Sequence, residues 1–153
     1  MTDKSAVNCR GKVYLVGAGP GDPLLVTLKG ANLLEEAEVV VYDRLVSEEI
    51  LSFCGERARL VYVGKEPGGR SVSQEEINDL LYREAAAGRM VVRLKGGDPW
   101  LFERGGEEMG YLLGKGIPVE VVPGITSALA VPAYAGIPIT YRGVSRSVVL
   151  ATG

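Results

Sequence analysis

The chain has 153 residues, of which 46% are apolar and 24% charged, a composition ordinary for one folded domain outside the membrane. Its net charge of -2, from 17 basic and 19 acidic residues, offers no basic face, so we expect no nucleic-acid partner. No apolar run reaches the roughly 18 residues of a membrane span and the first residues lack a signal-peptide core, so we expect no membrane partner and a cytoplasmic location.

Histidine is absent and cysteine is rare. Cys9 and Cys54 are too far apart for a metal or redox motif and suit a reducing compartment. Without histidine there is no Ser-His-Asp or Cys-His catalytic set and no imidazole metal site. We therefore expect no metal centre, and proton chemistry falls to Asp, Glu, Lys, Tyr or water.

Residues 12–16 are a short apolar run that stops at a glycine-rich loop, which predicts a buried strand. Asp22 is placed to cap a following helix with Pro23 in its first position. Apolar residues then recur at helical spacing as far as Leu34.

The same alternation continues along the chain. The pattern predicts strands at 38–42, 60–63, 90–94 and 118–122, and helices at 47–51, 73–88, 105–114 and from 126 or 127 to about 134. Continuously apolar strands separated by helices indicate an α/β fold, a five-stranded parallel sheet with helices on both faces.

Residues 136–143 interrupt the alternation, and residues 146–152 give a sixth strand signal with nothing after it. We therefore divide the chain into a domain at 1–135, a linker at 136–145 and, at 146–153, the first strand of a second domain in a longer protein. Residues 1–153 alone are expected to fold but to bind a cofactor weakly.

Glycines and charged residues cluster where the predicted strands end. In an open parallel sheet, ligands bind beyond the carboxyl ends of the strands. Here these ends are residues 17–22, 43–44, 64–65, 95–98 and 123–127, and four of the five contain glycine. Any one loop could be a plain turn, but several on one edge favour a binding site.

The first loop, GAGPGD at 17–22, invites a dinucleotide interpretation because Asp43 stands where a ribose-binding acid would be. Two details argue against it. Asp22 replaces the sixth-position glycine with a charge that repels pyrophosphate, and Pro20 removes a backbone N–H donor. A ligand without phosphate and with some positive charge fits better.

Gly-Asp-Pro occurs twice, at 21–23 and 97–99. Both aspartates suit helix caps, and we interpret Asp22 as one. Asp98 differs because Gly96 and Gly97 let the backbone lie close to a ligand while the carboxylate accepts from a hydroxyl or ammonium group. We therefore interpret Asp98 as a ligand contact.

Six segments together resemble the tetrapyrrole methylase family. They are VGAGPGDP at 16–23, VYDRLVS at 41–47, VGK at 63–65, QEEIN at 74–78, RLKGGDP at 93–99 and VPGITS at 122–127. They follow the family's order and spacing, and the likeness extends from Val13 to Thr152.

The resemblance implies a two-domain, homodimeric enzyme that transfers methyl groups from S-adenosylmethionine to carbons 2 and 7 of the tetrapyrrole uroporphyrinogen III. The products would be S-adenosylhomocysteine and precorrin-2, a precursor of sirohaem and cobalamin. The cofactor has a sulfonium charge and no phosphate, in agreement with the argument from the first loop.

The resemblance also implies roles for individual residues. It assigns cofactor contacts to Pro20, Gly96, Gly97, Asp98, Leu101, Thr126 and Ser127. It makes Asp43 the proton acceptor and Lys65 the proton donor, and a carboxylate suits a reaction in which positive charge develops on a pyrrole. Arg44 and Arg104 are our candidates for binding the substrate's carboxylates.

The chain departs from the family pattern at Glu103, where glycine is usual, so the turn after Phe102 is expected to differ. Tyr141 also replaces a common histidine. Three alternatives stay open: a sister methylase with another substrate, a nicotinamide-dependent dehydrogenase domain in which Asp43 binds ribose, and a non-catalytic dimerisation module.

Overall fold

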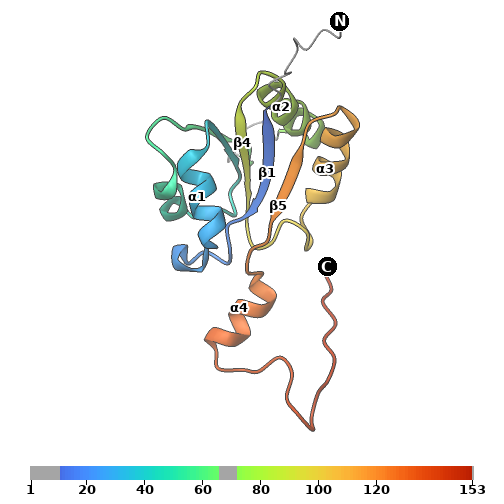
Figure 1. The fold of residues 1–153 in the computed structure, drawn as a ribbon. Helices are drawn as coiled ribbons and strands as arrows, with labels where there is room; N and C mark the ends of the chain where they lie inside the picture. The colour runs from blue at the N-terminus through green and yellow to red at the C-terminus, as the bar shows by residue number, and fades with distance from the viewer. Residues whose placement is uncertain (1–10, 66–71, 153) are drawn as a thin grey trace, which may run out of the picture.

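The computed structural model describes residues 11–65 and 72–152, so Cys9 lies outside the described residues. Figure 1 shows a central sheet with helices on either side and α4 beyond one end of the strands. In chain order the elements are β1 (Lys12–Gly17), η1 (Pro23–Leu25), α1 (Leu28–Glu36), β2 (Val39–Tyr42), η2 (Glu48–Phe53), β3 (Arg59–Tyr62), α2 (Gln74–Ala86), β4 (Met90–Lys95), α3 (Gly105–Gly114), β5 (Val119–Val122) and α4 (Ser127–Tyr134).

The sheet has five strands in the order β3-β2-β4-β1-β5, and every neighbouring pair is parallel. The predicted α/β fold is therefore confirmed. Parallel pairing directs all the strand ends to one edge, where the five predicted loops meet. In register, Val16 of β1 lies between Leu94 of β4 and Val122 of β5.

Alternate residues of the strands pack into two separate cores, one on each face. On one face Val13, Leu15 and Val91 pack with Leu81 of α2 and Leu112 of α3. Full burial of a leucine side chain contributes about 1.5–3 kcal/mol, so these two leucines hold both helices on this face.

The second core lies on the opposite face of the same strands. Here Val16, Val40 and Leu94 pack with Leu34 of α1 and Ile50 of η2. The switch of face between Leu15 and Val16 follows from the period of two in a strand. Figure 1 shows α1 on the opposite side of the sheet from α2 and α3.

The first helix begins later than predicted. Asp22 caps only a 3-10 turn, accepting from the Leu24 backbone N–H at 2.9 Å, with Pro23 in the first position. The α-helix starts at Leu28, where the Thr27 hydroxyl accepts from the Gly30 N–H at 3.0 Å. The prediction that Asp22 caps a long helix was therefore wrong, because extended backbone at Val26 separates the two turns.

The other helices agree more closely with the sequence patterns. Ser73 and Glu76 form the predicted capping box at the start of α2, and α3 has the predicted bounds. The segment predicted as a capped helix at 47–51 is the 3-10 helix η2. Ser47 makes no capping hydrogen bond, and its buried Oγ has no partner among the described residues.

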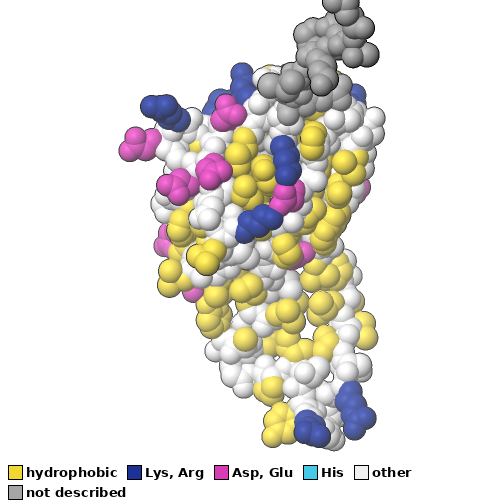
Figure 2. Space-filling view, viewed as in Figure 1, with side chains coloured by type: hydrophobic (Ala, Val, Ile, Leu, Met, Phe, Trp, Pro, Cys, Tyr) yellow, Lys and Arg dark blue, Asp and Glu magenta, His cyan; other side chains and the backbone are white. Residues whose placement is uncertain are grey.

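The chain after α4 does not continue the sheet. Residues 146–152, predicted as a sixth strand, form no strand and add nothing to the five-stranded sheet in the described structure. Figure 2 shows apolar side chains over this lower part of the molecule. The exposed apolar residues there include Leu129, Val131, Tyr134, Ile137, Tyr141, Val144 and Val149. Within the described residues, no helix is long and apolar enough to cross a membrane.

Candidate active site

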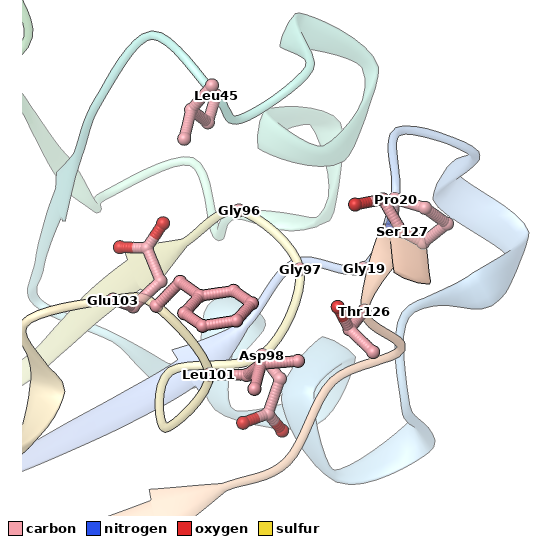
Figure 3. A pocket seen from close by; sticks show the side chains of 11 residues that line it. Gly19, Pro20, Leu45, Gly96, Gly97, Asp98, Leu101, Glu103, Thr126 and Ser127 are labelled. Atoms are coloured by element: carbon pink, nitrogen blue, oxygen red, sulfur yellow. The ribbon is translucent and has the colours of Figure 1, made fainter. Parts of the chain in front are cut away.

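A cavity of about 260 Å³ opens at the carboxyl edge of the sheet. It is lined by Gly19, Pro20, Leu45, Gly96, Gly97, Asp98, Leu101, Phe102, Glu103, Thr126 and Ser127. Figure 3 shows Leu45 and Glu103 on one side of the Gly96–Gly97 turn, and Pro20 and Thr126 on the other. Loops from four different strands thus form one site.

All seven residues predicted to contact the cofactor line this cavity. These are Pro20, Gly96, Gly97, Asp98, Leu101, Thr126 and Ser127. They lie in three segments separated by many residues, so the fold brings them together. Their contact with a ligand stays a prediction.

The loops after β1 and β4 are joined by a backbone pair between two glycines. The Gly19 N–H donates to the Gly97 carbonyl at 3.1 Å, and the Gly97 N–H donates to the Gly19 carbonyl at 2.8 Å. Both have positive φ, 77° and 62°, which L side chains rarely adopt. The Gly97 N–H is therefore already bonded within the protein. Glycine at positions 19 and 97 allows the backbone conformation in which the two loops pair.

Three glycines, Gly17, Gly97 and Gly124, meet just beyond the ends of β1, β4 and β5. A Cβ on Gly124 would lie 2.1 Å from the Gly97 carbonyl oxygen and 2.7 Å from the Gly17 Cα. A Cβ on Gly17 would lie 2.6 Å from the Gly124 Cα. The ends of β1, β4 and β5 can approach so closely because Gly17 and Gly124 lack side chains.

Asp98 accepts hydrogen bonds from backbone groups of two different loops. One carboxylate oxygen accepts from the Trp100 N–H at 2.8 Å and the other from the Gly124 N–H at 3.0 Å. The carboxylate therefore ties the loop after β4 to the loop after β5. A ligand hydroxyl or ammonium group that donates to Asp98, as predicted, would therefore share these oxygens with the two backbone N–H groups.

The predicted catalytic acid lies next to the cavity rather than in its wall. Asp43 accepts from the Leu45 N–H at 3.0 Å and from the Arg93 guanidinium at 2.9 Å. Its side chain is 19% exposed. Since Leu45 lines the cavity, Asp43 lies at the cavity margin.

The other charged candidates are on the surface and do not line the cavity. Lys65 and Arg44 are exposed. Arg104 is held by Glu107 through contacts of 2.9 Å and 2.5 Å. This pair raises the pKa of Arg104 and lowers the pKa of Glu107. A substrate carboxylate at Arg104 would therefore compete with an acid already in place.

A buried group of charges connects Asp43 to the cavity, and the sequence analysis did not single it out. Arg93 and Lys95, on the same face of β4, are 3% and 2% exposed. Arg93 donates to Glu108 at 3.2 Å as well as to Asp43. Lys95 lies 3.2 Å from both Glu108 oxygens and 3.4 Å from Glu103. In the sequence, two cations spaced two residues apart in an otherwise apolar strand, Arg93 and Lys95, could have indicated this buried ion network.

Glu103 brings this ion network (Asp43, Arg93, Lys95, Glu103 and Glu108) to the cavity wall. Burial raises the pKa of Glu103, and the negative charge of Asp43 raises it further. The ammonium of Lys95 opposes this shift without cancelling it. Phe102, which precedes Glu103, is the one described non-glycine residue with positive φ, 58°. That this turn differs from the family's stays a prediction.

Comparison with known proteins relates this geometry to a family. The family model for tetrapyrrole (corrin/porphyrin) methylases matches residues 12–153. A uroporphyrinogen-III C-methyltransferase of Methanocaldococcus jannaschii is 57% identical over 143 residues, which are 94% of this chain and 59% of that protein. The chain thus spans little more than half the length of this relative.

Solved structures give the same result. A uroporphyrin-III C-methyltransferase of Thermus thermophilus complexed with S-adenosylhomocysteine has a TM-score of 0.74 and 54% identity, over 90% of this chain and 53% of that one. A cobalt-precorrin-4 methyltransferase has a TM-score of 0.82 and 32% identity, over 96% of this chain and 59% of that one. The family match over nearly the whole chain and the shared fold show that the chain belongs to the tetrapyrrole methylase family.

Proposed function

We propose that the full-length protein transfers methyl groups from S-adenosylmethionine to carbons 2 and 7 of uroporphyrinogen III, giving precorrin-2 and S-adenosylhomocysteine. The main support is the convergence of all seven predicted cofactor residues on one cavity. The methyltransferase relatives at 54–57% identity support the same substrate class.

The cavity suits a cationic cofactor better than a dinucleotide. Its charged lining residues are acids, Asp98 and Glu103. In the first loop, the Gly19 N–H is already bonded to Gly97 and Pro20 has none, so neither can donate to a phosphate. Asp43, the ribose-binding acid of the dehydrogenase alternative, is held by Arg93 and Leu45.

In this proposal the chain supplies alignment and a proton acceptor. Alignment of a methyl donor with a pyrrole carbon can lower a barrier by about 7–11 kcal/mol. Asp43 would accept the proton that leaves the methylated ring, with its orientation fixed by Arg93 and the Leu45 N–H. A positioned acid or base typically contributes roughly 10²- to 10⁴-fold.

Lys65 and the two arginines, Arg44 and Arg104, would act on the substrate from outside the cavity. Lys65 would donate a proton or bind a substrate carboxylate, and its exposure leaves it free to approach a large ligand at the sheet edge. Arg44 would bind a substrate carboxylate from the loop that also holds Asp43. Arg104 would do so after exchanging Glu107 for the substrate.

The proposal extends to assembly and location. We place residues 1–135 in the first domain, 136–145 in a linker and 146–153 in the first strand of a second domain. A homodimer in the cytoplasm is proposed, without nucleic-acid or membrane partners. The exposed apolar side chains from Leu129 to Val149 support an interface, because a large apolar patch often marks one.

The direct test is an anaerobic assay of the purified full-length protein with S-adenosylmethionine and uroporphyrinogen III. The expected product carries two added methyl groups, one each on carbons 2 and 7. Methylation of a different corrinoid with none of uroporphyrinogen III would identify the sister-methylase alternative. No methyl transfer to any tetrapyrrole would contradict the proposal.

A further inference from the structure

The two acids in the cavity wall differ in how far their charge is compensated. Both Asp98 oxygens accept backbone N–H groups, one from Trp100 and one from Gly124. Glu103 has a single ion-pair partner recorded among the described residues, Lys95 at 3.4 Å. Glu103 is therefore the cavity acid with more capacity for a further positive partner.

Lys95 is itself shared, which leaves Glu103 only partly neutralised. Its ammonium lies nearer to Glu108, 3.2 Å from each oxygen, than to Glu103. Glu108 is fully buried and Glu103 is 19% exposed. The single ammonium of Lys95 is therefore divided between two carboxylates, of which Glu103 is the more exposed.

The whole ion network has more acids than bases. Asp43, Glu103 and Glu108 supply three carboxylates, whereas Arg93 and Lys95 supply two cations. With all five ionised, one negative charge remains uncompensated. Glu103 is the member that lines the cavity, so that charge is available to a ligand there. Burial is the largest cause of the raised pKa of Glu103, the charge of Lys95 opposes the shift, and the charge of Asp43 adds to it.

We propose that Glu103 is a specificity-determining residue that makes this cavity prefer the cationic sulfonium donor over its neutral thioether product. The inference rests on the proposed function, because it takes the cavity as the S-adenosylmethionine site. The two ligands share their adenosine, amino and carboxylate groups and differ in the methyl group and its sulfonium charge. A carboxylate beside a small, partly desolvated cavity therefore discriminates between them by charge.

The consequence is faster exchange of product for donor after each turnover. The charge of the sulfonium is lost when the methyl group leaves, and the attraction to Glu103 is lost with it. With a neutral residue at position 103, the Kd values for S-adenosylmethionine and S-adenosylhomocysteine would differ less in favour of S-adenosylmethionine. At equal concentrations of the two ligands, S-adenosylhomocysteine would then inhibit the neutral variant more strongly than it inhibits the wild type.

Calorimetry on the full-length protein tests this through the ratio of Kd for S-adenosylhomocysteine to Kd for S-adenosylmethionine. Glu103→Gln should lower the ratio roughly tenfold, mainly by weakening S-adenosylmethionine, given one charge contact in a partly buried site. Glu103→Asp keeps the charge and should stay within about twofold of the wild-type ratio.

Glu56→Gln is the matched control. Glu56 is an exposed acid in the turn before β3, at the opposite edge of the sheet, so this variant makes the same change in net charge away from the cavity. Its ratio should equal that of the wild type. An unchanged ratio in Glu103→Gln, or the same fall in Glu56→Gln, would overturn the inference while leaving the proposed function standing.

A readout without substitution covers the case in which Glu103→Gln does not fold. In the wild type the ratio should fall as the pH is lowered and Glu103 becomes protonated, since its pKa is raised above the ordinary value of 4.5. The groups facing Glu103 and its partner are Lys95, Asp43, Arg93 and Glu108, and Asp98 shares the cavity. A ratio that does not change with pH would overturn the inference. Failure of the wild type to bind either ligand would instead contradict the proposed function.

Discussion

The Lys95 ammonium lies 3.2 Å from both carboxylate oxygens of Glu108, and the two side chains are 2% and 0% exposed. Arg93 and Gln74 donate to the same carboxylate at 3.2 Å and 3.1 Å. Glu108 therefore joins β4, α2 and α3 beneath the site. Its charge is what makes two buried cations tolerable on this face of the sheet.

Removing that charge should destabilise the fold. Glu108→Gln leaves Lys95 and Arg93 without their shared carboxylate, and breaking a buried ion pair costs about 3–5 kcal/mol. Urea denaturation of the full-length protein should show the loss in free energy of unfolding. Glu107→Gln, one residue away but in an exposed pair, should leave the midpoint nearly unchanged. Equal effects of the two variants would contradict the importance of the buried network.

The close approach of Gly124 to Gly97 and Gly17 should leave no room for a methyl group on Gly124. Gly124→Ala places a Cβ 2.1 Å from the Gly97 carbonyl, so we expect about 1–3 kcal/mol of destabilisation and weaker cofactor binding. Gly110→Ala is the matched control, because its Cβ would meet no atom within 4 Å in the middle of α3. It should stabilise the protein by about 0.5–1 kcal/mol. Thermal denaturation separates the two, and a harmless Gly124→Ala would disprove the close approach.

Two acids should influence stability with opposite dependence on pH. The folded-state pKa of Glu103 is raised, so its contribution is greatest below its ordinary value of 4.5 and is lost as pH rises through the folded value. Lys12 and Lys29 lower the pKa of Glu120 to about 2, so its contribution is present above 4.5 and is lost as pH falls toward 2. Relative to the wild type, Glu103→Gln should therefore gain stability with rising pH and Glu120→Gln should lose it. Parallel pH profiles for the two variants would contradict these assignments.

Asp43 should matter for turnover more than for cofactor binding. Asp43→Asn keeps an oxygen that can accept the Leu45 N–H but removes the proton acceptor. Methyl transfer should fall at least ~10²-fold while the Kd for S-adenosylmethionine changes little. Glu56→Gln, far from the site, serves as the control. An unchanged rate in Asp43→Asn would exclude it as the proton acceptor.

The sequence predicted the sheet well because its central strands β1, β2 and β4 are largely buried and mostly apolar, and glycine follows most of the five strands. The five strand positions and the start of α3 at Gly105 follow from that pattern. The first helix was placed wrongly because Asp22 followed by Pro23 satisfies a 3-10 turn as well as an α-helix. Local patterns do not distinguish the two.

The site was predicted in part. The residues predicted to contact the cofactor line one cavity at this edge, because parallel strands place their ends together, and their contact with the cofactor stays a prediction. The partners of Asp98 and Lys95 were not predictable, since they depend on Gly124 and Glu108, which lie 26 and 13 residues away in the chain. Such contacts are fixed by how α3 and β5 pack on the sheet.

The most direct test of the account is calorimetry of the full-length protein with S-adenosylmethionine, S-adenosylhomocysteine and NAD. The cavity at Gly96, Gly97 and Asp98, with its acidic lining, predicts that the first two ligands bind and that NAD does not. Binding of NAD without binding of S-adenosylmethionine would contradict the assignment of this site.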